Sequence, residues 1–186
     1  MPLIRAYFYS PGPADHALNH VVTAWDPPYS HCDVQFQDGM ASSVFRGEKM
    51  YWRRRRFSKP GYSCVTLNVR QADYDRAYRL CQDRAASALA FDAWGMFTLP
   101  LAGMLGLERS EHTFCSKHCT EVLQLAGVKA VAGLDPRATT PSGLRRALHS
   151  SSSSVLHTDR IDLRIQAPPA DASRTGEVRW ATAGIQ

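Results

Sequence analysis

The chain has 186 residues and a net charge of +5, a length that fits one domain with a core of its own. Its 44% hydrophobic and 21% charged residues are typical of a globular protein and argue against a disordered or fibrous one. Glycines and a proline interrupt the longest apolar stretch, residues 94–107, so we expect no membrane-spanning helix. The first ten residues lack the basic start and apolar core of a secretory signal, which favours a cytoplasmic location.

Part of the positive charge comes from four consecutive arginines, Arg53–Arg56. Such a run can attract phosphates or acidic surfaces, although most runs of this kind are solvated. No motif of a nucleic-acid-binding module accompanies it. We therefore do not expect a nucleic-acid partner, and we keep a non-catalytic nucleic-acid- or protein-binding module that uses Arg53–Arg56 as an alternative.

The cysteines are five, an odd number, and their spacing is irregular. In a reducing compartment this pattern favours free thiols, buried or catalytic, over a framework of disulfides. The cysteines are Cys32, Cys64, Cys81, Cys115 and Cys119.

The hydrophobic pattern along the chain predicts both helices and strands. Expected strands are residues 4–9, 31–36, 40–45, 64–69 and 155–165, and expected helices are residues 14–25, 73–90, 113–126 and 141–148. An Asp-Gly turn at Asp38 and Gly39 joins two of the strands as a hairpin. Residues 91–107 read as a loop, residues 150–154 as a flexible serine connector and residues 165–186 as a flexible tail. The domain is expected to span residues 1–164.

Cys115 is the candidate nucleophile because it falls in the first turn of a predicted helix. Unpaired backbone N–H groups there carry partial positive charge and favour a thiolate. An activated cysteine also needs a base, most often a histidine oriented by a third polar group. His31 opens a strand and is the candidate base, and alternation places Asp33 on the same face. Ser42 and Ser43 on the returning strand compete with Asp33 as the third group.

A zinc site is the rival interpretation of the same segment. His112, Cys115, His118 and Cys119 lie within eight residues, and thiolates and imidazoles bind zinc well. Cys115, His118 and Cys119 are spaced so that they can converge from one helix. Structural zinc sites usually draw on two separated ligand pairs, and no second pair is present, so we expect no metal.

Four segments together resemble a known family, and the resemblance covers roughly residues 3–150. They are YSHCDVQFQDGMASS, FDAWGMFTLPL, FCSKHCTEVLQLAGV and TTPSGLRRAL, in this order. The set is similar to the circularly permuted papain-like proteins of the NlpC-type peptidase superfamily, which includes the lecithin–retinol acyltransferase group. The resemblance implies an α+β fold in which a small antiparallel sheet packs against the helix that bears the nucleophile. It also implies Cys115 as nucleophile and His31 as base.

The position of the residues before the nucleophile suggests the shape of the cleft. The loop containing Trp94 and the residue Phe114 precede Cys115 and are expected to line it, while the backbone N–H of Cys115 would stabilise an oxyanion. The expected function is cysteine-dependent hydrolysis of an amide, peptide or isopeptide bond in a bacterial or viral setting, without a cofactor. Thiol acyl transfer or lipid deacylation on the same fold is the alternative. The substrate would accordingly be a peptide, a protein conjugate or a lipid amide.

Overall fold

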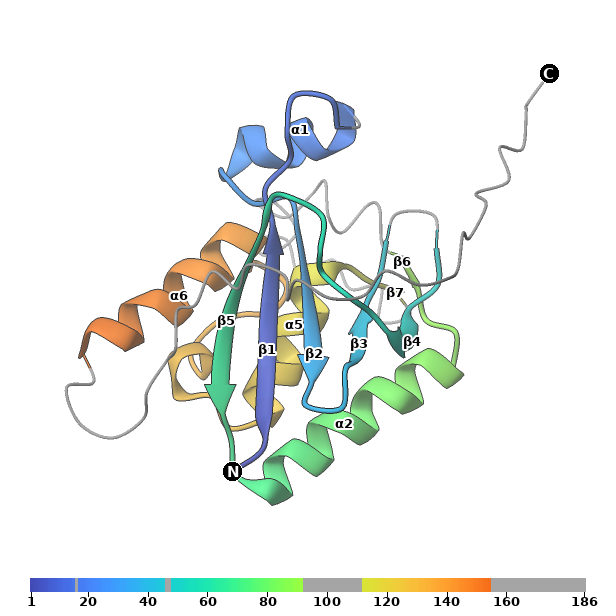
Figure 1. Cartoon of the computed structure of the whole chain (residues 1–186), viewed down its shortest axis with the longest axis vertical. Helices are drawn as coiled ribbons and strands as arrows, with labels where there is room; N and C mark the ends of the chain where they lie inside the picture. The colour runs from blue at the N-terminus through green and yellow to red at the C-terminus, as the bar shows by residue number, and fades with distance from the viewer. Residues whose placement is uncertain (16, 46–47, 92–111, 155–186) are drawn as a thin grey trace, which may run out of the picture.

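A computed structural model describes residues 1–15, 17–45, 48–91 and 112–154, and these form an α+β architecture (Figure 1). Five antiparallel strands make the main sheet, in the spatial order β4-β3-β2-β1-β5. They are β1 (Leu3–Tyr9), β2 (His31–Phe36), β3 (Met40–Ser43), β4 (Tyr51–Arg54) and β5 (Tyr62–Asn68). A short parallel pair, β6 (Ala90–Phe91) with β7 (His112–Thr113), lies outside this sheet. The expected α+β class and small antiparallel sheet are thus confirmed.

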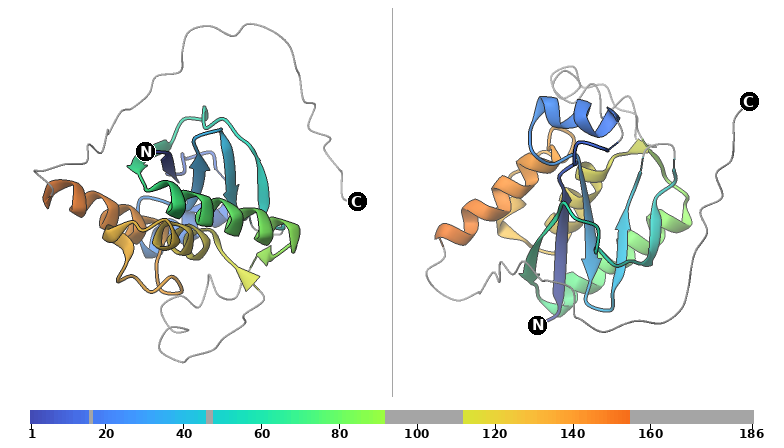
Figure 2. Two further views of the ribbon diagram at one scale, coloured as in Figure 1. Left: turned by 90° about the horizontal axis from the view of Figure 1, so that it is seen from below. Right: turned by 45° about the horizontal axis from the view of Figure 1, so that its top comes forward.

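Four α-helices accompany the sheet in the described part of the chain. They are α1 (Ala17–Trp25), α2 (Gln71–Ala86), α5 (Cys115–Leu125) and α6 (Pro141–Ser154), with a 3₁₀ turn η1 (Lys129–Val131) between the last two. Helices α2, α5 and α6 lie along one face of the sheet (Figure 2). None of the described helices is long and apolar enough to cross a membrane.

The core forms where this helical layer meets the sheet. Alternation along β2 turns Cys32, Val34 and Phe36 toward the helices, and all three are fully buried. Val122 and Leu123 of α5 are fully buried in the same cluster. Burying each such side chain contributes about 1.5–3 kcal/mol, so this layer holds α5 firmly against the centre of the sheet.

His118 fixes α5 to two further elements. Its Nδ1 lies 3.2 Å from Nη1 of Arg84 on α2, and its Nε2 lies 2.9 Å from Oγ of Ser42 on β3. Because a guanidinium can only donate, Nδ1 accepts and Nε2–H donates to Ser42. Burial, together with the charge of Arg84, lowers the pKa of His118 to about 3, so the ring is neutral.

The segment that leads into β2 is held by the start of α6. The Asp26 carboxylate accepts hydrogen bonds from Arg146 at 2.7 and 2.8 Å and another from Thr140. Ser142 Oγ donates to the Asp26 carbonyl at 2.7 Å and accepts from the Tyr29 N–H at 3.0 Å. These bonds fix the backbone immediately before His31, although they come from more than a hundred residues away in the sequence.

Several predicted boundaries were wrong. The first helix begins at Ala17 rather than residue 14, because Gly12, Pro13 and Ala14 belong to a turn closed by Asp15. The second helix ends at Ala86, and Ala88, with a φ of 53°, has left the helical conformation. The serine connector at residues 150–154 is the last part of α6.

One strand of the main sheet was not predicted, and three predicted segments lie where the structure describes no residues. Strand β4 was not predicted, because two of its four residues are exposed arginines. Residues 92–107 of the predicted loop, the expected strand at 155–165 and the tail at 165–186 lie outside the described residues.

The neutral state of His118 predicts an acid-sensitive fold. In the unfolded chain a histidine binds a proton near pH 6.5, whereas in the folded chain His118 does not until about pH 3. Stability therefore falls as the pH drops from 6.5 toward 3, by at most about 1.4 kcal/mol per pH unit from this residue. His118→Gln should lower the free energy of unfolding by about 1–3 kcal/mol at neutral pH. It should also reduce the dependence of this free energy on pH between 6.5 and 3, as measured by urea unfolding. His149→Gln, at an exposed position of α6, is the control, and an unchanged slope in His118→Gln would contradict the assignment.

Candidate active site

Cys115 and His31 meet where the first residue of α5 approaches the first residue of β2. Both residues are buried, with 5% and 8% of their surface exposed. Their side chains lie close enough for each to shift the pKa of the other. The two residues predicted as nucleophile and base are therefore brought together from positions more than eighty residues apart.

The environment of Cys115 favours its thiolate. A hydrogen bond from Cys32, followed by the nearby charge of protonated His31, holds the pKa of Cys115 well below its ordinary value, although burial acts in the opposite direction. Burial, with the contacts to Cys115 and Cys119, raises the pKa of Cys32 well above the usual range. Cys32 therefore keeps its proton, and its S–H group can donate a hydrogen bond to the Cys115 sulfur.

The environment of His31 favours its protonated form. Burial lowers its pKa, but the charges of Asp33 and Cys115 outweigh burial and raise the pKa to about 10. His31 Nε2 lies 3.3 Å from Asp33 Oδ1, an ion-pair distance without the alignment of a hydrogen bond. The ring of Phe45 stacks on the imidazole, with centroids 4.4 Å apart and planes 20° from parallel. At neutral pH the site thus holds a thiolate–imidazolium pair.

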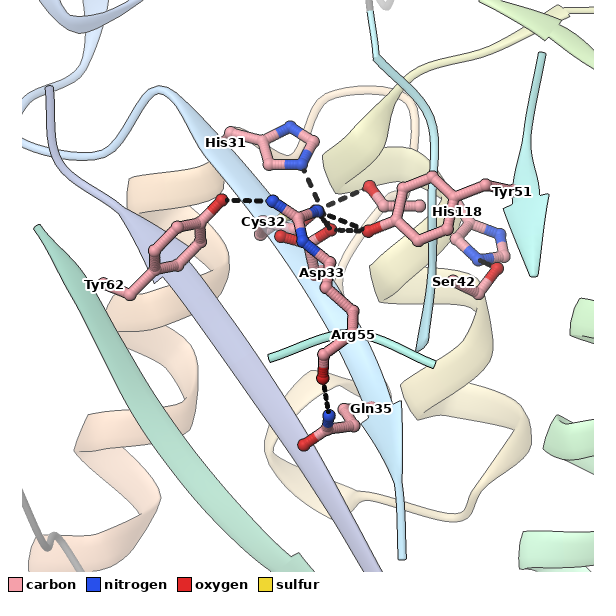
Figure 3. A network of polar contacts seen from close by, with 10 residues as sticks. His31, Cys32, Asp33, Gln35, Ser42, Tyr51, Arg55, Tyr62 and His118 are labelled. Carbon is pink, nitrogen blue, oxygen red and sulfur yellow. Dashed lines mark hydrogen bonds and ion pairs between the residues drawn. The ribbon is translucent and has the colours of Figure 1, made fainter. Parts of the chain in front are cut away.

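Asp33 is completely buried and anchors a polar network on this face of the sheet (Figure 3). Its Oδ1 accepts from Arg55 Nη1 at 2.9 Å and from the hydroxyl of Tyr51. Arg55 Nη2 in turn donates to the hydroxyl of Tyr62 at 2.8 Å. The carboxylate beside His31 is therefore held from its other side by a cation and a phenol.

The two serines that competed with Asp33 lie elsewhere. Ser43 Oγ donates to the carbonyl of Cys32 at 2.7 Å, and Ser42 Oγ bonds His118 (Figure 3). Both serines are fully buried in these contacts. Of the three candidates for the third position, Asp33 is the one that the structure places against the His31 ring.

The start of α5 supplies backbone donors beside the thiol. Phe114 precedes the helix in an extended conformation, with φ −128° and ψ 164°, and its side chain is buried. The N-cap residue Phe114 makes no side-chain capping hydrogen bond, and no acidic residue lies in the first turn. The first N–H groups of an α-helix have no partner within the helix, so in α5 that of Cys115 is a candidate donor to an oxyanion. Trp94, expected to line the cleft, lies outside the described residues.

The described residues give no support to the zinc interpretation. Among them, no three His, Cys, Asp or Glu side chains lie close enough together to hold a metal ion. His118 uses both ring nitrogens for Ser42 and Arg84, and Cys119 contacts Cys32. All five cysteines are free thiols, as their number and spacing predicted.

Tyr51, Arg55 and Tyr62 were not predicted as site residues. Arg55 was grouped with the solvated arginines, but only 21% of its side chain is exposed, whereas Arg53, Arg54 and Arg56 are exposed. The signal in the sequence was the aromatic residues on both sides of the run, in MYWRRRRF. Aromatic residues beside a cation can enclose it, which a purely solvated cluster would not require.

Comparisons with protein-family models, with curated proteins and with solved structures find no match to this chain. The geometry of the site must therefore carry the functional argument.

The electrostatics of the site predict that Asp33 controls the protonation of His31. Asp33→Asn keeps the shape but removes the charge, so the pKa of His31 should fall from about 10 by about 1–3 pH units. Titration of the His31 ring by NMR measures this directly. Asp38→Asn, in the exposed hairpin turn, is the matched control and should leave the His31 titration unchanged. An equal titration in wild type and Asp33→Asn would show that the carboxylate does not act on the ring.

Proposed function

We propose that this chain is a cysteine-dependent hydrolase of amide, peptide or isopeptide bonds. The observation that carries the proposal is the contact between Cys115 and His31, in which the pKa of the thiol is lowered and that of the imidazole is raised. Structural ion pairs also shift pKa values, but a thiolate at the start of a helix beside an imidazolium is the arrangement that nucleophilic catalysis by cysteine needs.

In the proposed first half-reaction the Cys115 thiolate attacks the carbonyl carbon of the substrate. The backbone N–H groups at the start of α5 would stabilise the oxyanion, at about 3–4 kcal/mol for each donor in well-studied enzymes. As the carbon–nitrogen bond breaks, protonated His31 gives its proton to the leaving amine. Because Nε2 faces Asp33, Nδ1 is the ring nitrogen assigned to this transfer.

In the second half-reaction neutral His31 removes a proton from water, which attacks the thioester. The bond to the Cys115 sulfur breaks, and the acid product leaves with the thiolate–imidazolium pair restored. Asp33 would hold the ring in one orientation through both transfers, the role a carboxylate plays beside a catalytic histidine. An acyl acceptor other than water would turn the same chemistry into acyl transfer.

The order of elements supports a permuted papain-like topology for this reaction. The strand that begins with His31 precedes the helix that begins with Cys115, and this helix packs against that strand. The start of α6, with Pro141 and Ser142, closes the arrangement by binding the segment before His31. We propose this topology on the arrangement of the site and on the motifs in the sequence.

A simple ester tests for the acyl-enzyme. Wild type should release p-nitrophenolate from p-nitrophenyl acetate in a burst that approaches one equivalent of protein, followed by slower turnover. Cys115→Ala should lose the burst, because no other described thiol has a lowered pKa, while keeping its melting temperature within a few degrees. Cys64→Ala, which removes a partly exposed thiol of β5, is the control and should keep the burst. A full burst in Cys115→Ala would refute the proposed nucleophile.

Alkylation tests the thiolate independently of any substrate. At pH 6 an ordinary thiol is almost entirely protonated, so iodoacetamide should label Cys115 far faster than the other four cysteines. His31→Ala removes the cation that stabilises the thiolate and should slow this labelling about 10-fold or more. Mass spectrometry after brief exposure locates the label. Even labelling of all cysteines in wild type would show that no activated thiol is present.

A further inference from the structure

Arg55 differs from the rest of the arginine run in the direction of its side chain. Arg53, Arg54 and Arg56 are exposed, whereas the guanidinium of Arg55 lies against the open face of the sheet, beside Asp33 (Figure 3). A cation in so enclosed a place is expensive to bury unless its donors are satisfied. The contacts of Arg55 show how this cost is met.

Among the described residues, the guanidinium contacts Asp33 and the aromatic side chains around it. Nη1 lies 2.9 Å from Asp33 Oδ1 and 2.7 Å from the Tyr51 hydroxyl, and Nη2 lies 2.8 Å from the Tyr62 hydroxyl. Aromatic rings surround the same group, with their centroids 4.8–5.7 Å from its central carbon. They belong to Phe45, Tyr51, Phe57 and Tyr62.

The backbone of Arg55 is held by β2 and by the turn that follows it. Gln35 Nε2 donates to the Arg55 carbonyl at 2.7 Å, and the Arg55 N–H donates to the carbonyl of Gly39 at 3.2 Å. His31, Asp33 and Gln35 alternate along one face of β2. This face thus carries in succession the proposed base, the carboxylate beside it and the amide that holds Arg55.

Arg55 contacts two of the neighbours of the His31 ring, Asp33 and Phe45. Asp33 Oδ1, 3.3 Å from Nε2, is the oxygen that Arg55 binds. Phe45 stacks on the imidazole and also lies under the guanidinium, 5.0 Å away. Without Arg55, the buried carboxylate would keep only His31 as a cationic partner, and the Phe45 ring would lose its cation–π contact.

We propose that Arg55 is a positioning residue for the Cys115–His31 pair, acting through Asp33 and Phe45 to fix the His31 ring. The inference rests on the proposed function, because it gives Arg55 a part in the same reaction. Arg55 is then part of the site. Of the four arginines in the run, the three exposed ones would be left to contact an anionic partner.

Three variants and an additive test the proposal. Arg55→Ala should slow the p-nitrophenyl acetate burst by about 100-fold, as a misplaced catalytic group does, with little change in KM. It should also slow the alkylation of Cys115, by no more than His31→Ala does. In Arg55→Ala, millimolar guanidinium chloride should restore much of the burst rate and the alkylation rate, because a guanidinium ion can bind among the four aromatic rings where the Arg55 side chain lay. Arg55→Lys keeps the charge but not the fork that spans Asp33 and Tyr62, so it should stay well below wild type. Arg56→Ala, an exposed neighbour, is the control and should match wild type.

The outcomes separate this proposal from a purely structural role and from the proposed function. Wild-type rates in Arg55→Ala, or in a folded Arg55→Lys if Arg55→Ala does not fold, would overturn the positioning role. Slow rates that guanidinium does not restore in a folded Arg55→Ala would overturn it as well. If wild type alkylates selectively but has no burst, the hydrolase proposal fails, while the dependence of alkylation on Arg55 still decides the role of this residue.

Discussion

The site depends on the packing of α5 against β2. Cys32 is the residue where this packing and the chemistry meet, because its side chain is fully buried under α5 and contacts both Cys115 and Cys119. The same packing sets the first turn of the helix beside His31. His118 adds a second attachment, one turn along α5, through Ser42 and Arg84. The reactive pair is thus placed by apolar burial and by the hydrogen bonds of a neutral histidine, which take no part in the proposed reaction.

Alternation along β2 places the core residues on one face of the strand and the polar residues of the site on the other. Cys32, Val34 and Phe36 face the helices and make the core, while the intervening polar residues face a layer made by the segment around Arg55. A buried carboxylate such as Asp33 would be strongly destabilising alone. Arg55 and Tyr51 both donate to its Oδ1, and aromatic rings pack around the guanidinium of Arg55. The electrostatics that distinguish Cys115 from the other thiols therefore depend on residues outside its own helix.

The sequence allowed much of this arrangement to be predicted, with instructive exceptions. Strand β2 was predicted with its exact ends, since an Asp-Gly turn and clear alternation mark it, and the helix start at Cys115 was within two residues. Asp33 and Ser43 could not be separated, because that choice depends on how β3 pairs with β2, with Val34 opposite Ser42. Arg55 could not be distinguished from its neighbours, because its partner Asp33 is distant in sequence and a polar run carries no hydrophobic period. Serines near a helix end gave no sign that α6 continues through them.

The hairpin at Asp38 and Gly39 has a consequence beyond joining two strands. Gly39 adopts a φ of +85°, and Asp38 accepts a hydrogen bond from the Met40 N–H, which together set the length of the turn. Side chains on a strand repeat every two residues, so a slip of β2 by one residue against this turn and against β1 would exchange its two faces. Cys32 would then stand where Asp33 and its neighbours meet Arg55, and His31 would face the helices. The chemistry of this surface therefore depends on the register of β2 as much as on the residues that β2 contains.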